Sequence, residues 1–278
     1  MKLNQFYVDN LIKEAISEDI NYIDVSADYL IPENQRNDSY FVAKADGVLC
    51  GLDIAMRVFT LLDDTFTYTV HKNDGDEVKA GDLIVEFNGK TACLLKGERT
   101  ALNIIQHMSG IATATNKAVK LCEGTNAQVT DTRKTLPGLR ALQKYAVVCG
   151  GGKNHRYNLS DGAMLKDNHI DAGGGITNAV AILRSKLGHM VKIEVETRNF
   201  DEVKEAVGAG ADIIMLDNMN NDQMKECVEY IDGRAKTEAS GNITLENIAE
   251  VAKTGVDIIS LGALTHSVKA FDISMKMR

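Results

Sequence analysis

The second half of the chain alternates between short apolar segments and helical patterns, and this alternation restricts the possible folds more than any other feature. Six candidate strands occur, at 127–133, 162–167, 191–196, 212–217, 234–240 and 257–262. Most are separated by amphipathic segments such as NFDEVKEAVGAGA and TLENIAEVAKTGV. Such a repeat builds a parallel sheet covered by helices. The last two helical segments end in GAGAD and KTGVD, glycine turns that lead directly into the next strand, as αβ loops do in (β/α) barrels.

The predicted fold class is α/β, with two domains. Residues 111–265 are expected to form an incomplete (β/α) barrel. A doubly wound open sheet is the alternative, but the glycine-rich phosphate fingerprint after its first strand is absent. Residues 1–110 are expected to form an α+β domain, joined by the C-terminal tail 266–278. This domain contains an N-terminal helix, then an antiparallel sheet from YFVAKADGVLCG, TFTYTVHKN and DGDEVKAGDLIVEFNG, then a long helix from Lys96 to Leu121.

Composition excludes several classes of protein. The 278 residues include 23 glycines, two prolines and only 5% aromatic residues, which fits many strand-to-helix turns better than an aromatic-rich sandwich. A net charge of -8 argues against nucleic-acid binding. The five cysteines are widely spaced, form no CxxC, and suggest neither a disulfide framework nor a zinc knuckle. No apolar run has the length of a membrane span or signal peptide, so we expect a soluble cytoplasmic protein.

The carboxyl ends of the candidate strands are strongly polar. In a barrel of parallel strands the active site lies at these ends. A single polar strand end is most simply a solvated one, but agreement among six ends favours a functional site. The residues at these ends are Arg133, Lys134, Lys166, Asp167, Glu196, Asp217, Glu238, Ser240, Ser260 and Gly262.

The strand 191–196 places three ionisable residues on one face. Lys192, Glu194 and Glu196 alternate with two apolar residues, so all three point the same way. That face is either the barrel lumen or the side covered by helices. Charges under helices are costly unless they are paired, so we favour a functional lumen over a structural ion pair.

Residues 133–169 form the most cationic segment of an acidic protein. They contain seven lysine or arginine residues against two aspartates. Gly150, Gly151 and Gly152 offer a loop that can lie against a ligand, and Lys153, His155 and Arg156 follow directly. We therefore expect a polyanionic small molecule here. Glu196 and Asp217 lie opposite, suited to hold Mg²⁺ or to stabilise a cationic transition state.

Several motifs together identify a resemblance that extends over nearly the whole chain. They are GERTALNIIQHMSGIAT (97–113), DTRKTLPGLRALQKYAVVCGGGKNHRYNLSDGAMLKDNHI (131–170), IEVE (193–196), GADIIMLDNM (210–219), EASGNI (238–243) and ISLGALTHS (259–267). In this order and spacing, the chain resembles the quinolinate phosphoribosyltransferase family. The resemblance implies phosphoribosyl transfer from phosphoribosyl pyrophosphate to quinolinate, with decarboxylation to nicotinate mononucleotide, pyrophosphate and CO₂ in de novo NAD biosynthesis.

The resemblance also implies roles for individual residues. Arg133, His155, Arg156 and Lys166 would hold the quinolinate carboxylates, with Thr132 also in the substrate site. Lys134 and Lys166 would face the phosphates. Glu196 and Asp217 would bind the ribose hydroxyls and Mg²⁺. The turns Ser240-Gly241-Asn242 and Ser260-Leu261-Gly262 would cradle the 5'-phosphate. Arg99 would reach the site of a neighbouring subunit in a homodimer, with a hexamer as the alternative assembly.

Three other functions are weighed against this one. The nearest is the homologous group associated with molybdenum transport, which acts on another anionic substrate. A barrel aldolase would use Lys166 or Lys192 as a Schiff-base lysine. A lipoyl or biotinyl carrier is suggested by residues 74–89, but the lysine that such a domain modifies is missing from the expected hairpin tip. The complete set of six cationic residues, namely Arg99, Arg133, Lys134, His155, Arg156 and Lys166, favours the quinolinate reaction.

Overall fold

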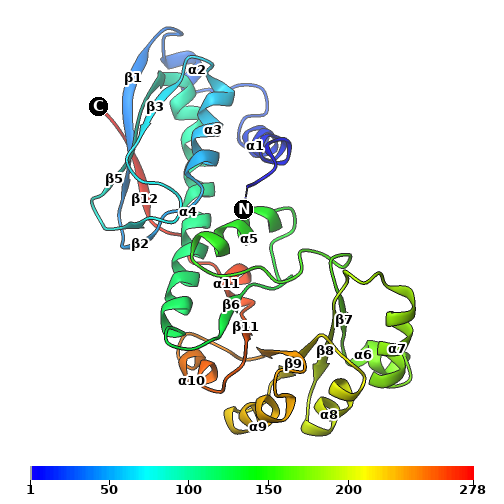
Figure 1. Cartoon of the computed structure of the whole chain (residues 1–278). Coiled ribbons are helices and arrows are strands. Elements are labelled where there is room, and N and C mark those ends of the chain that lie inside the picture. Colours follow the sequence, from blue (N-terminus) through cyan, green and yellow to red (C-terminus); the bar gives the residue numbers. More distant parts are fainter. Residues whose placement is uncertain (1) are drawn as a thin grey trace. The chain divides into compact units, whose positions relative to one another are not determined.

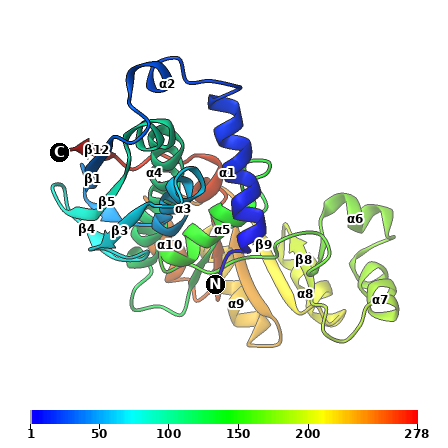
Figure 2. The same cartoon turned by 90° about the horizontal axis from the view of Figure 1, so that it is seen from above.

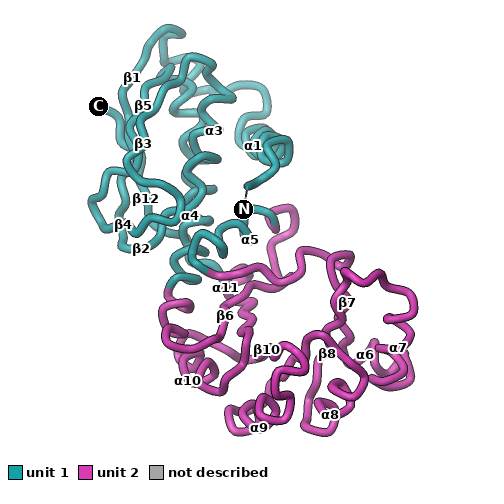
Figure 3. The backbone as a smooth tube through the Cα atoms, viewed as in Figure 1, with its two compact units in different colours: residues 1–116, 141–151, 268–278 teal, residues 117–140, 152–267 magenta. Residues whose placement is uncertain are grey.

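The computed structural model describes residues 2–278, which divide into two compact units (Figure 3). Unit 1 takes the chain up to Asn116 together with 141–151 and 268–278. Unit 2 takes 117–140 and 152–267. The domain bounds expected from the sequence, 1–110 and 111–265, stay a prediction.

Unit 1 is built on a four-stranded antiparallel sheet in the order β12-β1-β5-β3 (Figure 1). Its strands are β1 (Arg36–Ala43), β3 (Thr67–Val70), β5 (Leu83–Lys90) and β12 (Ile273–Met277). Two short strands, β2 (Gly47–Val48) and β4 (Glu77–Val78), pair separately. Ser39, Phe41 and Ala43 alternate along β1 and are all buried, so one face of the sheet lies against the core. The predicted antiparallel sheet is confirmed.

The other elements of unit 1 are helices, and the helix at 52–62 packs on the sheet (Figures 1 and 2). They are α1 (Gln5–Asp19), α2 (Ala27–Leu30), α3 (Leu52–Leu62), α4 (Thr91–Leu121) and α5 (Arg140–Cys149). The N-terminal and long helices are confirmed, whereas the sequence analysis did not anticipate α3. Phe59 of α3 stacks on Phe87 of β5 at 5.3 Å, and Phe41 packs edge-on against the same ring at 5.2 Å. These aromatic contacts anchor the helix to the sheet.

Unit 2 contains a six-stranded, wholly parallel sheet in the order β6-β11-β10-β9-β8-β7. Its strands are β6 (Gln128–Thr130), β7 (Ala163–Leu165), β8 (Ile193–Thr197), β9 (Ile213–Asp217), β10 (Lys236–Ser240) and β11 (Ile258–Ser260). All six predicted strands are therefore confirmed. Within the described residues, β6 and β7 form the two edges and do not pair with each other. The incomplete barrel expected from the sequence is the observed fold.

Helices follow the strands of unit 2 and lie on the outside of the curved sheet (Figure 1). They are α6 (Asp167–Ala172), α7 (Ile176–Lys186), α8 (Phe200–Gly208), α9 (Asn221–Ile231), α10 (Ile248–Ala252) and α11 (Ala263–His266). The glycine turns connect a helix to the next strand of the sheet. Gly210 before β9 has φ +75°, and Gly255 before β11 has φ +90°. Across residues 2–278, no helix combines the length and apolarity needed to span a bilayer.

Candidate active site

A cavity of about 610 Å³ lies at the carboxyl ends of the unit 2 strands. Its lining comes from the ends of all six strands or the loops that follow them, and from the loop before β7. The lining residues are Thr132, Arg133, Lys134, His155, Arg156, Met164, Lys166, Glu196, Met215, Asp217, Asn218, Glu238, Ser240, Gly241, Asn242 and Ser260. This is the place at which a parallel barrel presents its chemistry.

Strand register explains why these side chains meet. Met215 of β9 is paired with Glu196 of β8 on one side and with Glu238 of β10 on the other. One step further along, Asp217 is paired with Ser240. Residues two apart in a strand share a face, so these five side chains point into the same space. The sheet therefore brings acidic and hydroxyl groups together from strands that are distant in sequence.

One side of the cavity is cationic. Arg133 and Lys134 follow β6 and are exposed, and the Lys134 amide donates to the Thr132 hydroxyl at 3.0 Å. Arg156 donates from its guanidinium to the Gly162 carbonyl at 2.8 Å. Burial, reinforced by the charge of Arg133, lowers the pKa of Arg156. The cations thus repel one another, as expected for a site that an anion would stabilise.

The lining also includes acidic residues. Lys166 Nζ donates to Glu196 Oε2 at 2.7 Å, and it is the only ion pair of Glu196 among the described residues. Burial, and next the charge of Glu196, raises the pKa of Asp217. A carboxylate whose pKa is raised by a neighbouring carboxylate lies in a favourable site for a cation. The donor set of Glu196 and Asp217 is all oxygen, which fits Mg²⁺.

Beneath the cavity, His155 contacts two buried glutamates. Its Nε2 lies 3.2 Å from Glu194 and 3.4 Å from Glu238, whose side chains are 4% and 1% exposed. Burial favours the neutral ring, but hydrogen bonds to both carboxylates outweigh it and raise the pKa of His155 to about 10. Burial also raises the pKa of Glu194. Nδ1 lies 2.7 Å from the Arg156 amide, the acceptor position of a neutral ring. The raised pKa means that a proton is retained, although Nδ1 is placed to accept a hydrogen bond. This proton is therefore shared among His155, Glu194 and Glu238.

The loop that carries His155 is fixed by Asp131, a fully buried carboxylate at the end of β6. Asp131 accepts from the His155 amide at 3.0 Å and from Asn154 Nδ2 at 2.6 Å. The Lys153 amide donates to the Val129 carbonyl at 2.8 Å, which continues the edge of the sheet. These bonds hold the cationic loop beside β6, so its position is set by the barrel itself.

The loops after β9 and β10 are packed against each other in unusual backbone conformations. Gly241 has φ +90°, while Asn218 and Asn242 have φ +56° and +53°. Asn242 Nδ2 donates to Asn218 Oδ1 at 2.9 Å, and Asn218 Nδ2 donates to Asp217 at 2.7 Å. A Cβ on Gly241 would lie 2.2 Å from Asn218 Oδ1. Glycine is thus required here by both conformation and space.

The cavity gathers twelve of the fifteen residues that the sequence analysis selected as a site. Of the remaining three, Leu261 is buried, Gly262 packs against the Lys134 side chain, and Arg99 is an exposed residue of unit 1. Four lining residues were outside that selection: Met164, Met215, Asn218 and Glu238. Met164, Met215 and Glu238 each lie two residues before a selected residue, namely Lys166, Asp217 and Ser240, and this spacing was the available signal. Asn218 directly follows Asp217, and only Glu238 had been noted as a strand end.

Two expectations about local geometry were wrong. Lys192 does not share the lumen with Glu194 and Glu196, because it precedes β8 and forms an exposed ion pair with Asp212 at 3.4 Å. The three glycines at 150–152 do not line the cavity. Gly150 is instead required by packing within unit 1, where a Cβ would lie 2.4 Å from the Ala112 carbonyl oxygen.

Comparisons with known proteins agree over the whole chain. The family described as "Quinolinate phosphoribosyl transferase, N-terminal domain" matches residues 24–109, and its C-terminal counterpart matches 111–276. The chain is 46% identical over 273 residues to the "Probable nicotinate-nucleotide pyrophosphorylase [carboxylating]" of Bacillus subtilis, covering 98% of this chain and 94% of that protein. It is 42% identical to the chloroplastic nicotinate-nucleotide pyrophosphorylase of Arabidopsis thaliana, covering 96% and 82%.

Solved structures give the same result. The crystal structure of NadC from Streptococcus pyogenes superposes with a TM-score of 0.96 at 42% identity, covering 99% of this chain and 98% of that one. The nicotinate-nucleotide pyrophosphorylase of Francisella tularensis gives a TM-score of 0.94 at 40% identity, covering 100% and 98%.

Proposed function

This chain belongs to the quinolinate phosphoribosyltransferase family, and on that premise we propose that it transfers the phosphoribosyl group of phosphoribosyl pyrophosphate to the ring nitrogen of quinolinate. One quinolinate carboxylate is lost as CO₂, and the other products are nicotinate mononucleotide and pyrophosphate. This is a step of de novo NAD biosynthesis. The observation that carries the proposal is the cavity of unit 2, whose lining combines cations with two carboxylates.

We assign the quinolinate carboxylates to Arg133, Arg156 and Lys166. Arginine forks onto a carboxylate, and the mutual repulsion of Arg133 and Arg156 is relieved when an anion lies between them. Both ring nitrogens of His155 already lie within hydrogen-bond distance of protein groups. We therefore propose that His155 positions the backbone of Arg156 and does not itself bind the substrate. Thr132 supports the same wall by accepting from the Lys134 amide.

The phosphoribosyl group is assigned to the remaining walls of the cavity. Lys134 and Lys166 face the phosphates, while Glu196 and Asp217 accept from the ribose hydroxyls. Gly241 and Asn242, both with positive φ, form a turn at the cavity, and we propose that the backbone amides of this turn bind the anion. Ser260 lines the cavity, and its buried hydroxyl has no hydrogen-bond partner among the described residues. Together the loops Ser240-Gly241-Asn242 and Ser260-Leu261-Gly262 are proposed to hold the 5'-phosphate.

The chemistry of these side chains follows the charge of the reaction. Positive charge develops on the ribose carbon as pyrophosphate leaves, and Glu196 and Asp217 stabilise it. Lys134 and Lys166 attract the departing negative charge. We propose that Glu196 and Asp217 also hold Mg²⁺, which when bound supplies further positive charge to the pyrophosphate. The alkylated ring nitrogen then stabilises the carbanion left by CO₂, and Arg133 and Arg156 keep the ring oriented.

We further propose that the protein works as a homodimer in which Arg99 completes the site of the partner subunit. Arg99 is exposed, and its side chain forms no hydrogen bond or ion pair with residues 2–278. Unit 1 also exposes large apolar side chains close together in sequence, with Tyr22, Tyr29 and Leu30 at 87%, 79% and 77%. Such side chains are typical of a surface that another chain covers. A hexamer made of three such dimers is the larger alternative. A cytoplasmic location is proposed because all five cysteines are free thiols.

The direct test mixes purified protein with quinolinate, phosphoribosyl pyrophosphate and Mg²⁺, and measures nicotinate mononucleotide together with labelled CO₂. We expect the two products in equal amounts, with no product when nicotinate replaces quinolinate. Lys166→Ala, folded by circular dichroism, should be inactive. Absence of both products from the folded wild-type protein would overturn the proposal and favour another anionic substrate.

A further inference from the structure

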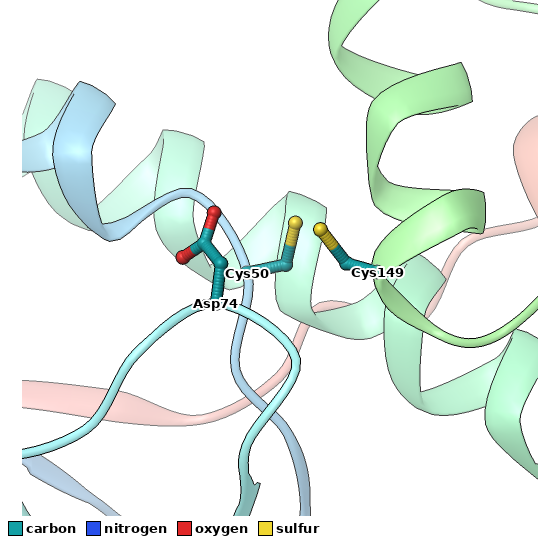
Figure 4. Close-up of side chains that lie close together, drawn as sticks. All are labelled: Cys50, Asp74 and Cys149. Carbon is teal, nitrogen blue, oxygen red and sulfur yellow. The ribbon is translucent and has the colours of Figure 1, made fainter. Parts of the chain in front are cut away.

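A second cluster of reactive side chains lies in unit 1, and the proposed reaction does not use it. Cys50 immediately precedes Gly51 and α3, Asp74 lies in the loop between β3 and β4, and Cys149 ends α5. Both Sγ atoms and a carboxylate oxygen of Asp74 all lie within 4.8 Å of one another. Figure 4 shows the two sulfurs adjacent, with the Asp74 carboxylate beside Cys50. Three segments far apart in sequence therefore converge on one point.

We propose that Cys50, Asp74 and Cys149 bind one thiophilic divalent cation of the Zn²⁺ class. Donor atoms around a tetrahedral Zn²⁺ are typically about 3.5–4 Å apart, as follows from metal–ligand distances of about 2.0–2.3 Å. The three donor atoms lie within 4.8 Å of one another, so binding would require them to approach through side-chain rotation. Two sulfurs select a soft metal and disfavour Mg²⁺, which requires oxygen ligands. The site is thus chemically distinct from the oxygen site of Glu196 and Asp217.

The carboxylate of Asp74 is held in place by donors to both of its oxygens. The Gly51 amide donates to Oδ1 and Oδ2, both at 2.9 Å, the Leu52 amide donates to Oδ1 at 3.0 Å, and the Tyr145 hydroxyl donates to Oδ2 at 3.0 Å. Because the Gly51 amide is shared between the two oxygens, it can keep one acceptor while the other oxygen turns a lone pair to a metal. Partners of this kind orient a metal ligand and strengthen its binding. Tyr145 therefore acts as a positioning residue for the proposed cation.

The cluster gathers acidic groups without a cationic partner. Burial raises the pKa values of Cys50 and Asp74, whereas the hydrogen bond with Cys50 lowers the pKa of Cys149. Among the described residues, Asp74 is bonded to two amides and a hydroxyl and to no lysine or arginine. A divalent ion would neutralise this group, and its binding would release the two thiol protons to solvent. The cost of burying three acidic groups together is then offset by coordination.

Solvent can reach the site. Asp74 and Cys149 are only partly buried. Asp74 and Tyr145 also line a cavity of about 720 Å³ within unit 1. This cavity offers an entry path, and water from it can occupy the fourth coordination position, as in three-ligand zinc sites.

The test titrates Co²⁺ into the reduced, chelator-treated full-length protein without substrates or Mg²⁺. Thiolate ligation gives Co²⁺ an intense near-ultraviolet charge-transfer band, which a site of histidine and carboxylates such as His155, Glu194 and Glu238 does not produce. We expect one equivalent to bind with this band, and Zn²⁺ to displace it. Cys149→Ser should lose about half of the band and weaken binding by more than about tenfold, since a ligand contributes at least as much as an outer partner.

Two variants sharpen the result. Tyr145→Phe should keep the band but weaken Co²⁺ binding about tenfold, because it removes the hydroxyl that contacts Asp74 and Cys149 and leaves all three ligands in place. Cys93→Ser is the matched control, since Cys93 lies outside the cluster and a serine hydroxyl can replace its bond to the Leu62 carbonyl. It should bind Co²⁺ as the wild type does. No thiolate band in the wild type, or an equal band in folded Cys149→Ser, would overturn the proposal. Failure here would leave the enzyme assay unaffected, so the two proposals are separable.

Discussion

Arg133 and Arg156 lie in the same cavity, but the fold depends on them differently. Arg133 is exposed and its guanidinium makes no hydrogen bond to the described residues, whereas Arg156 also supports the Gly162 carbonyl. Substitution of the two arginines should therefore have different effects. Substitution of Arg133 should affect substrate binding alone, whereas substitution of Arg156 should also disturb the loop before β7.

We expect Arg133→Ala to raise the KM for quinolinate by roughly ten- to a hundredfold, because a hydrogen bond to a charged group contributes about 1.5–3 kcal/mol. Its free energy of unfolding should change by less than about 0.5 kcal/mol, as is usual for exposed positions. Steady-state kinetics and urea unfolding measure the two effects. Lys192→Ala, at the other end of β8, should leave the KM unchanged. Unfolding of Arg133→Ala at 25 °C would contradict the assignment.

The His155 cluster predicts a pH-dependent contribution to stability. Because the folded-state pKa of His155 is raised from 6.5 to about 10, its contribution is fully present below about pH 6.5 and is lost as the pH rises through about 10. The wild type should therefore exceed His155→Gln in unfolding free energy most at pH 6, and the difference should shrink by pH 10. Urea unfolding at several pH values measures it. A difference that stays constant over this range would show that the cluster does not hold the proton.

At the scale of elements, the two loops after β9 and β10 matter more than any single strand. Asn218, Gly241 and Asn242 hold each other in left-handed conformations, and Asn218 in turn holds Asp217. Strain of this kind persists only where the surroundings enforce it. Because the parallel sheet fixes the starting points of both loops, the proposed phosphate-binding turn is a product of the strand order.

Gly241→Ala should raise the KM for phosphoribosyl pyrophosphate at least about tenfold and destabilise the fold by more than about 1 kcal/mol, through left-handed strain and collision with Asn218. Gly210→Ala is the matched control. Gly210 has φ +75°, but nothing lies within 4 Å of an added Cβ, so only the strain is introduced. Its KM values should equal those of the wild type. Equal kinetic effects in the two variants would exclude a specific role for the Gly241 loop.

At the scale of the whole molecule, the proposed dimer makes each site depend on two chains. Arg99→Ala and Lys166→Ala should each be nearly inactive alone. When they are unfolded together and refolded, about half of the dimers are hybrids with one intact site, so we expect about a quarter of the wild-type activity, from the statistics of a symmetric dimer. Product formation measures the recovery. A mixture of Lys166→Ala with Glu196→Ala should recover no activity. Each of these changes lies in the cavity of the chain that carries it, so both sites of a hybrid dimer are defective. No recovery in the first mixture would contradict a shared site.

Much of this protein follows from local pattern. The six strands of unit 2 could be predicted because each is a short apolar run that ends in polar residues. The alternation of side chains along a strand predicted which residues share a face. The N-terminal helix and α4 were readable from helical spacing. Twelve site residues lie together because strand ends converge in a parallel barrel. The family was predicted from the composition and from the order of the motifs.

Tertiary structure decided the rest, because it depends on contacts between residues distant in sequence. Helix α3 was missed between two strand-like segments, and its place is set by Phe59 packing on Phe87. Lys192 and the three glycines at 150–152 were misplaced because sequence pattern does not show where a strand begins or what a loop packs against. No spacing rule joins Cys50 to Cys149, since the fold alone brings them to Asp74. The sequence by itself determined the elements and the chemistry at the strand ends, and three-dimensional packing determined which groups share a proton or can share a metal.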